Sequence, residues 1–348
     1  MTGEIALWLA QDGMTSGAIY ALLALALLLV FAVTRVIFVP QGEFVVYAAL
    51  TLGTLQLGQT PATAWMLVGA GALVAATEGV AAWRERAWQR LPRIAAVHVA
   101  LPVAVAAAAV WLAPRDPGLA VQMALTAALV VPLGPMLYRL AYQPLAQASV
   151  LVLFIVSMAV HYAMMGMALV MFGAEGLRTS PIAGASFALG PISVGAQSLW
   201  VLAASLACMA ALAVYFGRSY GGKALRATAV NRVGARLVGI PPARAGRAAF
   251  TLAAAIGTLS GILISPIVTV YYDTGLMFGL KGFVGAILGG MASYPLAVLG
   301  ALGVGLLEAF SSFWASQLKE VIVFTLILPV LLWRSLAARG HEIEQEEE

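Results

Sequence analysis

The sequence is poor in the residues from which disulfides, metal sites and catalytic groups are built. Its 348 residues include one cysteine, Cys208, and three histidines. A lone cysteine allows neither an intramolecular disulfide nor a cysteine metal cluster. His98 and His161 each stand alone in an apolar run, so we expect packed helix residues, no metal site and no cofactor. No His/Asp/Glu or Ser/Lys constellation indicates catalysis, which argues against an enzyme.

Charged residues are also scarce. They make up 10% of the chain and hydrophobic residues 62%, whereas an average soluble domain has about 25% charged and about 45 to 50% apolar residues. This balance excludes an ordinary soluble fold. The pI near 9.3 indicates basic loops on the cytoplasmic side of a membrane rather than a nucleic-acid partner.

Long apolar runs fill nearly the whole chain instead. A bilayer core of about 30 Å needs about 20 consecutive apolar residues per helix, and these runs lack the alternation of barrel strands. The sequence therefore predicts an all-α, polytopic transmembrane helical bundle of about 11 spans. They are expected at residues 12–33, 36–58, 62–83, 94–113, 118–139, 149–172, 197–216, 248–270, 276–292, 295–313 and 319–337.

Arginine and lysine predict the orientation. With the N-terminus outside, 15 of the 19 Arg and Lys residues would lie on the inner side, as the positive-inside rule requires. We expect no cleaved signal peptide, because the N-terminus lacks a basic region and a small-residue cleavage site. Residues 1–340 form the expected membrane domain, and the acidic tail 341–348 (HEIEQEEE) is expected to be solvated and disordered.

The stretch 35–44 (RVIFVPQGEF) predicts a broken helix. Pro40 and Gly42 interrupt an apolar span, and such breaks are tolerated where they line a cavity or are buried in protein. An acid in this setting is costly, so Glu43 is a candidate for the substrate path. The alternative is that Glu43 lies near the inner boundary and pairs with Arg35 in a purely structural role.

A second interrupted segment is expected at 275–290 (GLMFGLKGFVGAILGG), which contains six glycines. The helix pairs 12–58 and 248–292 would run in opposite directions, which suggests an inverted repeat with a substrate path between its halves. Ordinary packing of small residues is the alternative. Glu308 lies in a later apolar run and is expected to face a polar group on another helix.

The inner loop 217–247 is the most informative connection. Residues 222–240 form an amphipathic, basic segment of helix length that ends at Gly239 and two prolines. This segment predicts a docking helix, with a juxtamembrane helix held to anionic lipid as the alternative. The preceding GRSYGGK, residues 217–223, matches part of a phosphate-binding loop, but Ala224 replaces the required hydroxyl residue, so we expect no ATP binding here.

Three blocks in this order resemble the permeases of the branched-chain amino acid ABC importers, the LivH-like members of the hydrophobic amino acid uptake family. The blocks are SGAIYALLALALLLVFAVTRVIFVPQGEF (16–44), GGKALRATAVNRVGARLVGI (221–240) and LKGFVGAILGGMASYPLAVLGALGVGLLEAFSS (280–312). The resemblance implies a transport subunit of the bacterial inner membrane for branched-chain or related small amino acids. It also implies four kinds of partner besides membrane lipid: a second, LivM-like permease subunit, two ATP-binding subunits, a periplasmic binding protein and a small-molecule substrate.

The resemblance assigns residues to two roles. The substrate pathway is expected to include Phe38, Pro40, Gln41, Gly42, Glu43, Lys281, Phe283, Gly289, Gly290 and Glu308. ATPase docking is expected to use Arg226, Ala227, Asn231, Ala235, Gly239 and Ile240. Phe38 and Pro40 replace the Asn and Ala usual in the family, which puts the exact substrate in doubt.

The chain also has an apparent extra helical hairpin around residues 65–117, for which the sequence suggests no function. The alternative class of protein is an ion-coupled secondary transporter or channel for a small polar solute. In that class Glu43 or Glu308 would bind the coupling ion, and the 222–240 segment would have no docking role.

Overall fold

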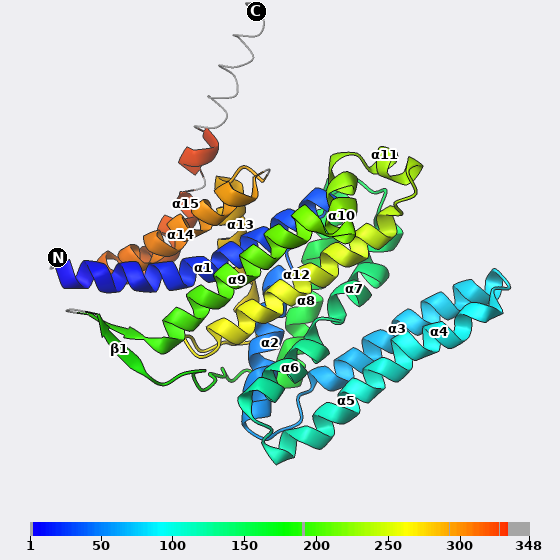
Figure 1. Cartoon of the computed structure of the whole chain (residues 1–348), viewed down its shortest axis with the longest axis horizontal. Helices are drawn as coiled ribbons and strands as arrows, with labels where there is room; N and C mark the ends of the chain where they lie inside the picture. The colour runs from blue at the N-terminus through cyan, green and yellow to red at the C-terminus, as the bar shows by residue number, and fades with distance from the viewer. Residues whose placement is uncertain (1–2, 190–191, 292, 327, 333–348) are drawn as a thin grey trace, which may run out of the picture.

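The computed structural model describes residues 3–189, 192–291, 293–326 and 328–332, and most of them are helical (Figure 1). The one sheet among them is a two-stranded antiparallel hairpin of β1 (Ser186–Leu189) and β2 (Ile192–Gly195). The α-helices are α1 (Gly3–Thr34), α2 (Gln41–Gln56), α3 (Thr63–Arg84), α4 (Leu91–Ala95), α5 (Leu101–Leu112), α6 (Leu119–Val130), α7 (Leu133–Leu137), α8 (Val150–Phe172), α9 (Ala196–Arg218), α10 (Tyr220–Val230), α11 (Arg232–Leu237), α12 (Pro242–Ile264), α13 (Gly275–Leu288), α14 (Tyr294–Trp314) and α15 (Lys319–Thr325).

The all-helical membrane bundle predicted from the sequence is confirmed. Eight helical segments of the described chain are long and apolar enough to cross a membrane. Two of the eleven expected spans are shorter: 36–58 contains the 16-residue α2, and 276–292 contains the 14-residue α13. The expected span 319–337 lies partly outside the described residues, and the acidic tail lies wholly outside them.

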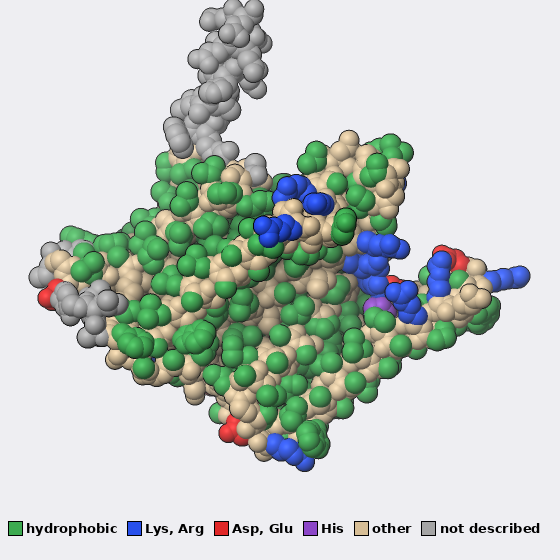
Figure 2. Space-filling view, in the orientation of Figure 1, with side chains coloured by type: hydrophobic (Ala, Val, Ile, Leu, Met, Phe, Trp, Pro, Cys, Tyr) green, Lys and Arg blue, Asp and Glu red, His purple; other side chains and the backbone are tan. Residues whose placement is uncertain are grey.

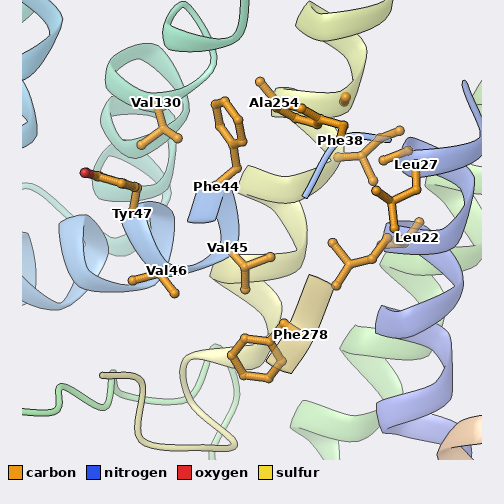
Figure 3. Packing of buried hydrophobic residues seen from close by; sticks show 14 of the residues in the cluster. Leu22, Leu27, Phe38, Phe44, Val45, Val46, Tyr47, Val130, Ala254 and Phe278 are labelled. Atoms are coloured by element: carbon orange, nitrogen blue, oxygen red, sulfur yellow. The ribbon is translucent and has the colours of Figure 1, made fainter. Parts of the chain in front are cut away.

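Helix α1 is the central element of the bundle. It is buried almost continuously from Gly13 to Thr34 because α9, α12, α13 and α14 surround it. Glycines let α14 approach closely: a side chain at Gly13 or Gly17 would collide with the α14 backbone near Leu306 or Leu302. Figure 3 shows the core beside α1, where buried side chains of α1, α2, α6, α12 and α13 meet.

The chain breaks between α1 and α2, as expected, but the break is longer than the sequence suggested. Residues 35–38 are non-helical, a turn follows at Val39 and Pro40, and α2 begins only at Gln41. The expected helix start at residue 36 is therefore wrong. Arg35 has a positive φ of 59°, which ends α1, and Pro40 stands immediately before α2, where its missing N–H costs no helical hydrogen bond.

Helix α13 ends at Leu288 rather than at residue 292. Gly290, with φ 73°, donates its N–H to the carbonyl of Ile287, and the Met291 N–H reaches back to Ala286. These two bonds form the Schellman motif that closes helices at a glycine in the left-handed region. Helix α14, which begins at Tyr294, packs against α13.

Helices α3 to α5 form a hairpin that projects beside the main bundle (Figure 1). Its helical residues run from Thr63 to Leu112 and so begin two residues before the stretch around 65–117 that was expected to be an extra hairpin. That the hairpin is an insertion relative to the family stays a prediction.

Candidate functional site

The N-termini of the two short helices, α2 and α13, meet inside the bundle. A side chain at Gly42 would overlap the carbonyl oxygen of Gly275 and would lie 2.9 Å from the backbone nitrogen of Gly279. The neighbouring Gln41 donates a hydrogen bond of 3.0 Å from its amide nitrogen to the carbonyl oxygen of Ala253 on α12. The predicted residues Gln41 and Gly42 thus hold three helices together at one junction.

Glu43 lies at this junction and pairs with His161 of α8. The Nδ1 atom of His161 is 2.9 Å from Oε1 of Glu43, and the two side chains are 1% and 0% exposed. The carboxylate rests on Gly275, where an added Cβ would lie 2.6 Å from Cδ of Glu43. The partner of Glu43 is therefore His161, and the alternative in which Arg35 is the partner is wrong.

His161 was missed as a site residue because it was interpreted as a packed residue without ligands. It is the one ionisable residue of α8 besides Tyr162. A buried acid in one apolar helix and a buried base in another are expected to pair, because neither tolerates isolation in a membrane. That rule could have predicted that Glu43 pairs with a basic residue, although it could not have predicted which helices meet.

Phe38 packs in an aromatic cluster rather than beside an open path. Its ring centroid lies 4.7 Å from that of Phe250, 5.9 Å from that of Tyr142 and 6.0 Å from that of Phe44. The side chain is fully buried. These contacts show that Phe38 packs in the core. A role of Phe38 and Pro40 in lining the substrate pathway stays a prediction.

A second polar cluster gathers around Lys281 of α13. Its Nζ atom lies 2.6 Å from Oε1 of Glu308 on α14 and 3.1 Å from Oε1 of Glu320 on α15. The hydroxyl of Tyr20 on α1 donates to Oε2 of Glu308 at 2.7 Å. Lys281 and Glu308, predicted separately, are thus in direct contact, whereas Tyr20 and Glu320 were not anticipated.

This cluster borders a cavity of about 370 Å³ that Asp12 and Phe278 also line. The cavity therefore presents an ammonium group and carboxylates next to an aromatic ring. Such a set can hold both ends of a small zwitterion. The remaining predicted residues of the late block lie elsewhere: Gly289 makes room for the backbone of Ala297, and Gly290 closes α13. Phe283 packs half-buried against the core.

The expected docking segment forms two short helices, α10 and α11. Asn231 lies between them and accepts the Gly234 N–H at 2.9 Å, so its side chain caps α11. Gly239, with φ 83°, ends α11, where the Ile240 N–H bonds to the Ala235 carbonyl. Asn231, Gly239 and Ile240 thus shape the segment rather than only presenting a surface.

Most of the predicted docking residues of this segment are exposed, but Ala235 is not. Ala235 is buried at 3% exposure, whereas Arg226 and Ala227 are exposed. Four apolar side chains that were not predicted are strongly exposed as well: Val230, Val233, Leu237 and Val238. Sequence reasoning missed them because an amphipathic pattern does not say which face the rest of the protein covers.

The segment is tied to the end of α1. Arg232 of α11 donates a hydrogen bond of 2.7 Å to the carbonyl oxygen of Val33. Burial, with the nearby charge of Arg35, lowers the pKa of the Arg232 guanidinium from its usual value. A displacement of α11 would therefore act on α1 directly.

The long apolar helices, the two short helices and the buried ion pairs define a multi-pass helical membrane protein. The chain belongs to the family described as branched-chain amino acid transport system permease components, whose model matches residues 96–331.

Among curated proteins, it is 35% identical over 136 residues to the high-affinity branched-chain amino acid transport system permease protein LivH of Escherichia coli K12. That match covers 38% of this chain and 44% of LivH. It is 30% identical over 157 residues to the corresponding protein BraD of Pseudomonas aeruginosa, covering 44% of this chain and 51% of BraD. The chain thus spans about half the length of these relatives, and no solved structure matches it significantly.

Proposed function

We propose that this protein is a membrane-spanning permease subunit of an ABC importer in a bacterial inner membrane, and that it translocates branched-chain or related small amino acids. The family match over residues 96–331 carries the proposal, because it extends from the hairpin to the last described helices. Both relatives bear names of high-affinity branched-chain amino acid permeases. In this role the chain has no ATPase activity of its own.

The proposed partners are a second permease subunit, two ATP-binding subunits and a periplasmic binding protein. The exposed apolar residues of α10 and α11 support an ATPase contact, because apolar side chains in a solvated loop are costly unless a partner covers them. The N-terminus would be periplasmic and the C-terminus cytoplasmic, as the distribution of Arg and Lys favours.

The proposed substrate path passes the Lys281 cavity on the outer side. An amino acid carries a carboxylate, which would replace Glu320 beside Lys281, and an ammonium group, which Asp12 can bind. Helix α13 joins this cavity to the Glu43 junction, because Gly275 contacts Glu43 while Lys281 contacts Glu308. A small movement of α13 would therefore change the contacts both in the Lys281 cavity and at the Glu43 junction.

An ion-coupled transporter receives less support from the same contacts. Its coupling ion would require a carboxylate that is open to a cation. Glu43 contacts His161 and Glu308 contacts Lys281, so each acid already has a basic partner.

Reconstitution tests the proposal directly. We expect vesicles that contain this chain alone to show no ATP-dependent uptake of radiolabelled Leu, Ile or Val. Uptake should appear when the neighbouring permease, the ATPase subunits and the binding protein are added. Uptake by the single chain, driven by an ion gradient and without ATP, would contradict it, and a panel with urea, amides and aromatic amino acids would define the substrate.

Changing Leu237 to Asp should weaken ATPase recovery in a pull-down by about tenfold or more, since a central apolar contact often contributes over 1 kcal/mol. Leu237 is 84% exposed, so the change should not unfold the chain. Phe187→Asp is the matched control, because Phe187 is 54% exposed on the distant β1 strand. Equal ATPase recovery with both variants would contradict the docking assignment.

A further inference from the structure

The α3–α5 hairpin encloses a deep crevice with α12 and the segment that follows α7. The cavity measures about 660 Å³. Its lining includes five arginines and two glutamates, together with His98. Figure 2 shows Lys and Arg side chains on both sides of the hollow between the hairpin and the rest of the molecule. None of the proposed transport roles uses this crevice.

The crevice carries an excess of positive charge. Glu78 forms an ion pair with Arg139, and Glu85 forms one with Arg90 at 3.2 Å. The other three arginines, Arg93, Arg244 and Arg247, form no ion pair with a described residue. Clustered guanidinium groups are suited to bidentate binding of phosphate.

An apolar groove continues from the floor of this crevice. A second cavity of about 430 Å³ shares Val97, His98, Arg139 and Arg247 with the first and is otherwise lined almost wholly by apolar side chains, among them Leu101 and Val105. A basic mouth that opens into a long apolar groove suits a ligand with an anionic head and a hydrocarbon tail.

The floor between the two cavities is irregular and contains an unpartnered polar atom. His98 lies in a π-helical turn, Ala96–Ala100, and Arg139 lies in another, Tyr138–Tyr142. His98 is only 8% exposed, and its Nε2 atom contacts Arg139. Its buried Nδ1 atom has no hydrogen-bond partner in the described structure. Single π turns often mark functional sites.

Tryptophans indicate the depth of the crevice in the membrane. Trp65 and Trp111 lie exposed near one end of the hairpin, and Trp83 and Trp88 near the other. The 18 residues from Trp65 to Trp83 span about 27 Å of helix, close to the hydrocarbon core of about 30 Å. Exposed tryptophans gather at headgroup level. Glu85, between the second pair in sequence, and Arg93, five residues after Trp88, both line the crevice.

We propose that this crevice binds an anionic phospholipid. Arg93, Arg244 and Arg247 hold the phosphate, and an acyl chain occupies the apolar groove beside Leu101 and Val105. The lipid comes from the leaflet on the side of α10 and α11, because Arg244 follows α11 directly at the start of α12. The hairpin then serves as a lipid-bound wall of the bundle.

Neutralising the site should release the lipid. The full chain with Arg93→Gln and Arg247→Gln should bind phosphatidylglycerol about 25-fold more weakly, since each hydrogen bond from a guanidinium to the phosphate contributes about fivefold. Binding is measured in phosphatidylcholine nanodiscs titrated with phosphatidylglycerol, by native mass spectrometry and by the shift in melting temperature. Arg84→Gln with Arg86→Gln removes the same charge from a part of the hairpin that does not line the crevice, and should leave binding within about twofold of wild type.

Two further arms separate the proposal from other occupants. Ala128→Phe, in the apolar groove, should reduce binding of the lipid without removing any charge. Inorganic phosphate should not compete at equal concentration, and deletion of residues 341–348 should leave lipid binding unchanged.

Equal losses in the two arginine pairs would overturn the proposal. So would full competition by phosphate, which would indicate a free anion site. A rise in lipid binding after removal of the acidic tail would assign the crevice to that tail. The variant Arg93→Lys with Arg247→Lys is the control for misfolding. It keeps both positive charges and should retain most of the lipid binding.

Discussion

Replacing Gly42 with alanine is expected to destabilise the protein by about 3 kcal/mol or more, at the upper end of overpacking effects. The added Cβ would overlap the carbonyl oxygen of Gly275 and would lie 2.7 Å from its carbon. Backbone atoms cannot rotate away as a side chain can, so α2 and α13 would have to separate. The folded yield and the melting temperature of detergent-purified protein measure the effect.

Gly79→Ala is the matched control. Gly79 also lies inside a helix, α3, but a Cβ there meets nothing within 4 Å. Alanine should therefore be neutral or should stabilise the helix by up to about 1 kcal/mol. If both variants behaved alike, the close approach of α2 and α13 would not be a structural requirement.

Replacing His161 with leucine is expected to cost about 1 to 3 kcal/mol, the usual penalty for leaving a buried polar group without its partner. Glu43 would remain 0% exposed and would lose its one basic neighbour. Thermal unfolding in the same detergent measures the loss. Tyr162→Leu is the control on the same helix, since Tyr162 is 55% exposed, and it should change the free energy of unfolding by at most about 0.5 kcal/mol.

The double variant Glu43→Leu with His161→Leu distinguishes pairing from simple loss of volume. If the unpartnered carboxyl group is the cause, removing Glu43 as well should restore part of the stability, because the two effects of a contacting pair do not add. A double variant whose loss equals the sum of the single losses would contradict the pairing. Uptake should be measured in parallel, since stability can return while transport does not.

Several elements were predictable because the signal is local. Apolar runs long enough to span a bilayer require helices, since backbone groups in lipid must bond within their own segment. The helix break before Gln41 follows from Pro40, and the end of α11 follows from Gly239. The family blocks, read in order, predicted the family that the match over residues 96–331 confirms.

The partners of the charged residues were harder to predict because they come from distant parts of the chain. Glu43 and His161 are 118 positions apart in the sequence, and nothing in either apolar run says which helix faces which. The same limit applies to Lys281, whose contact with Glu308 was not predicted although both residues were singled out. The exposed face of α10 and α11 was missed for a related reason, because burial of Ala235 depends on neighbouring elements.

The sequence by itself therefore determined the membrane class, the approximate helices, their breaks and the family, since each follows from composition, local chain chemistry or motif order. The tertiary structure alone decided that α2 and α13 meet at Gly42, that each buried acid has a basic partner, and that five arginines surround one crevice beside an apolar groove. The physical reason is that helices are local structures, whereas helix packing brings together side chains whose separation in sequence contains no information about distance.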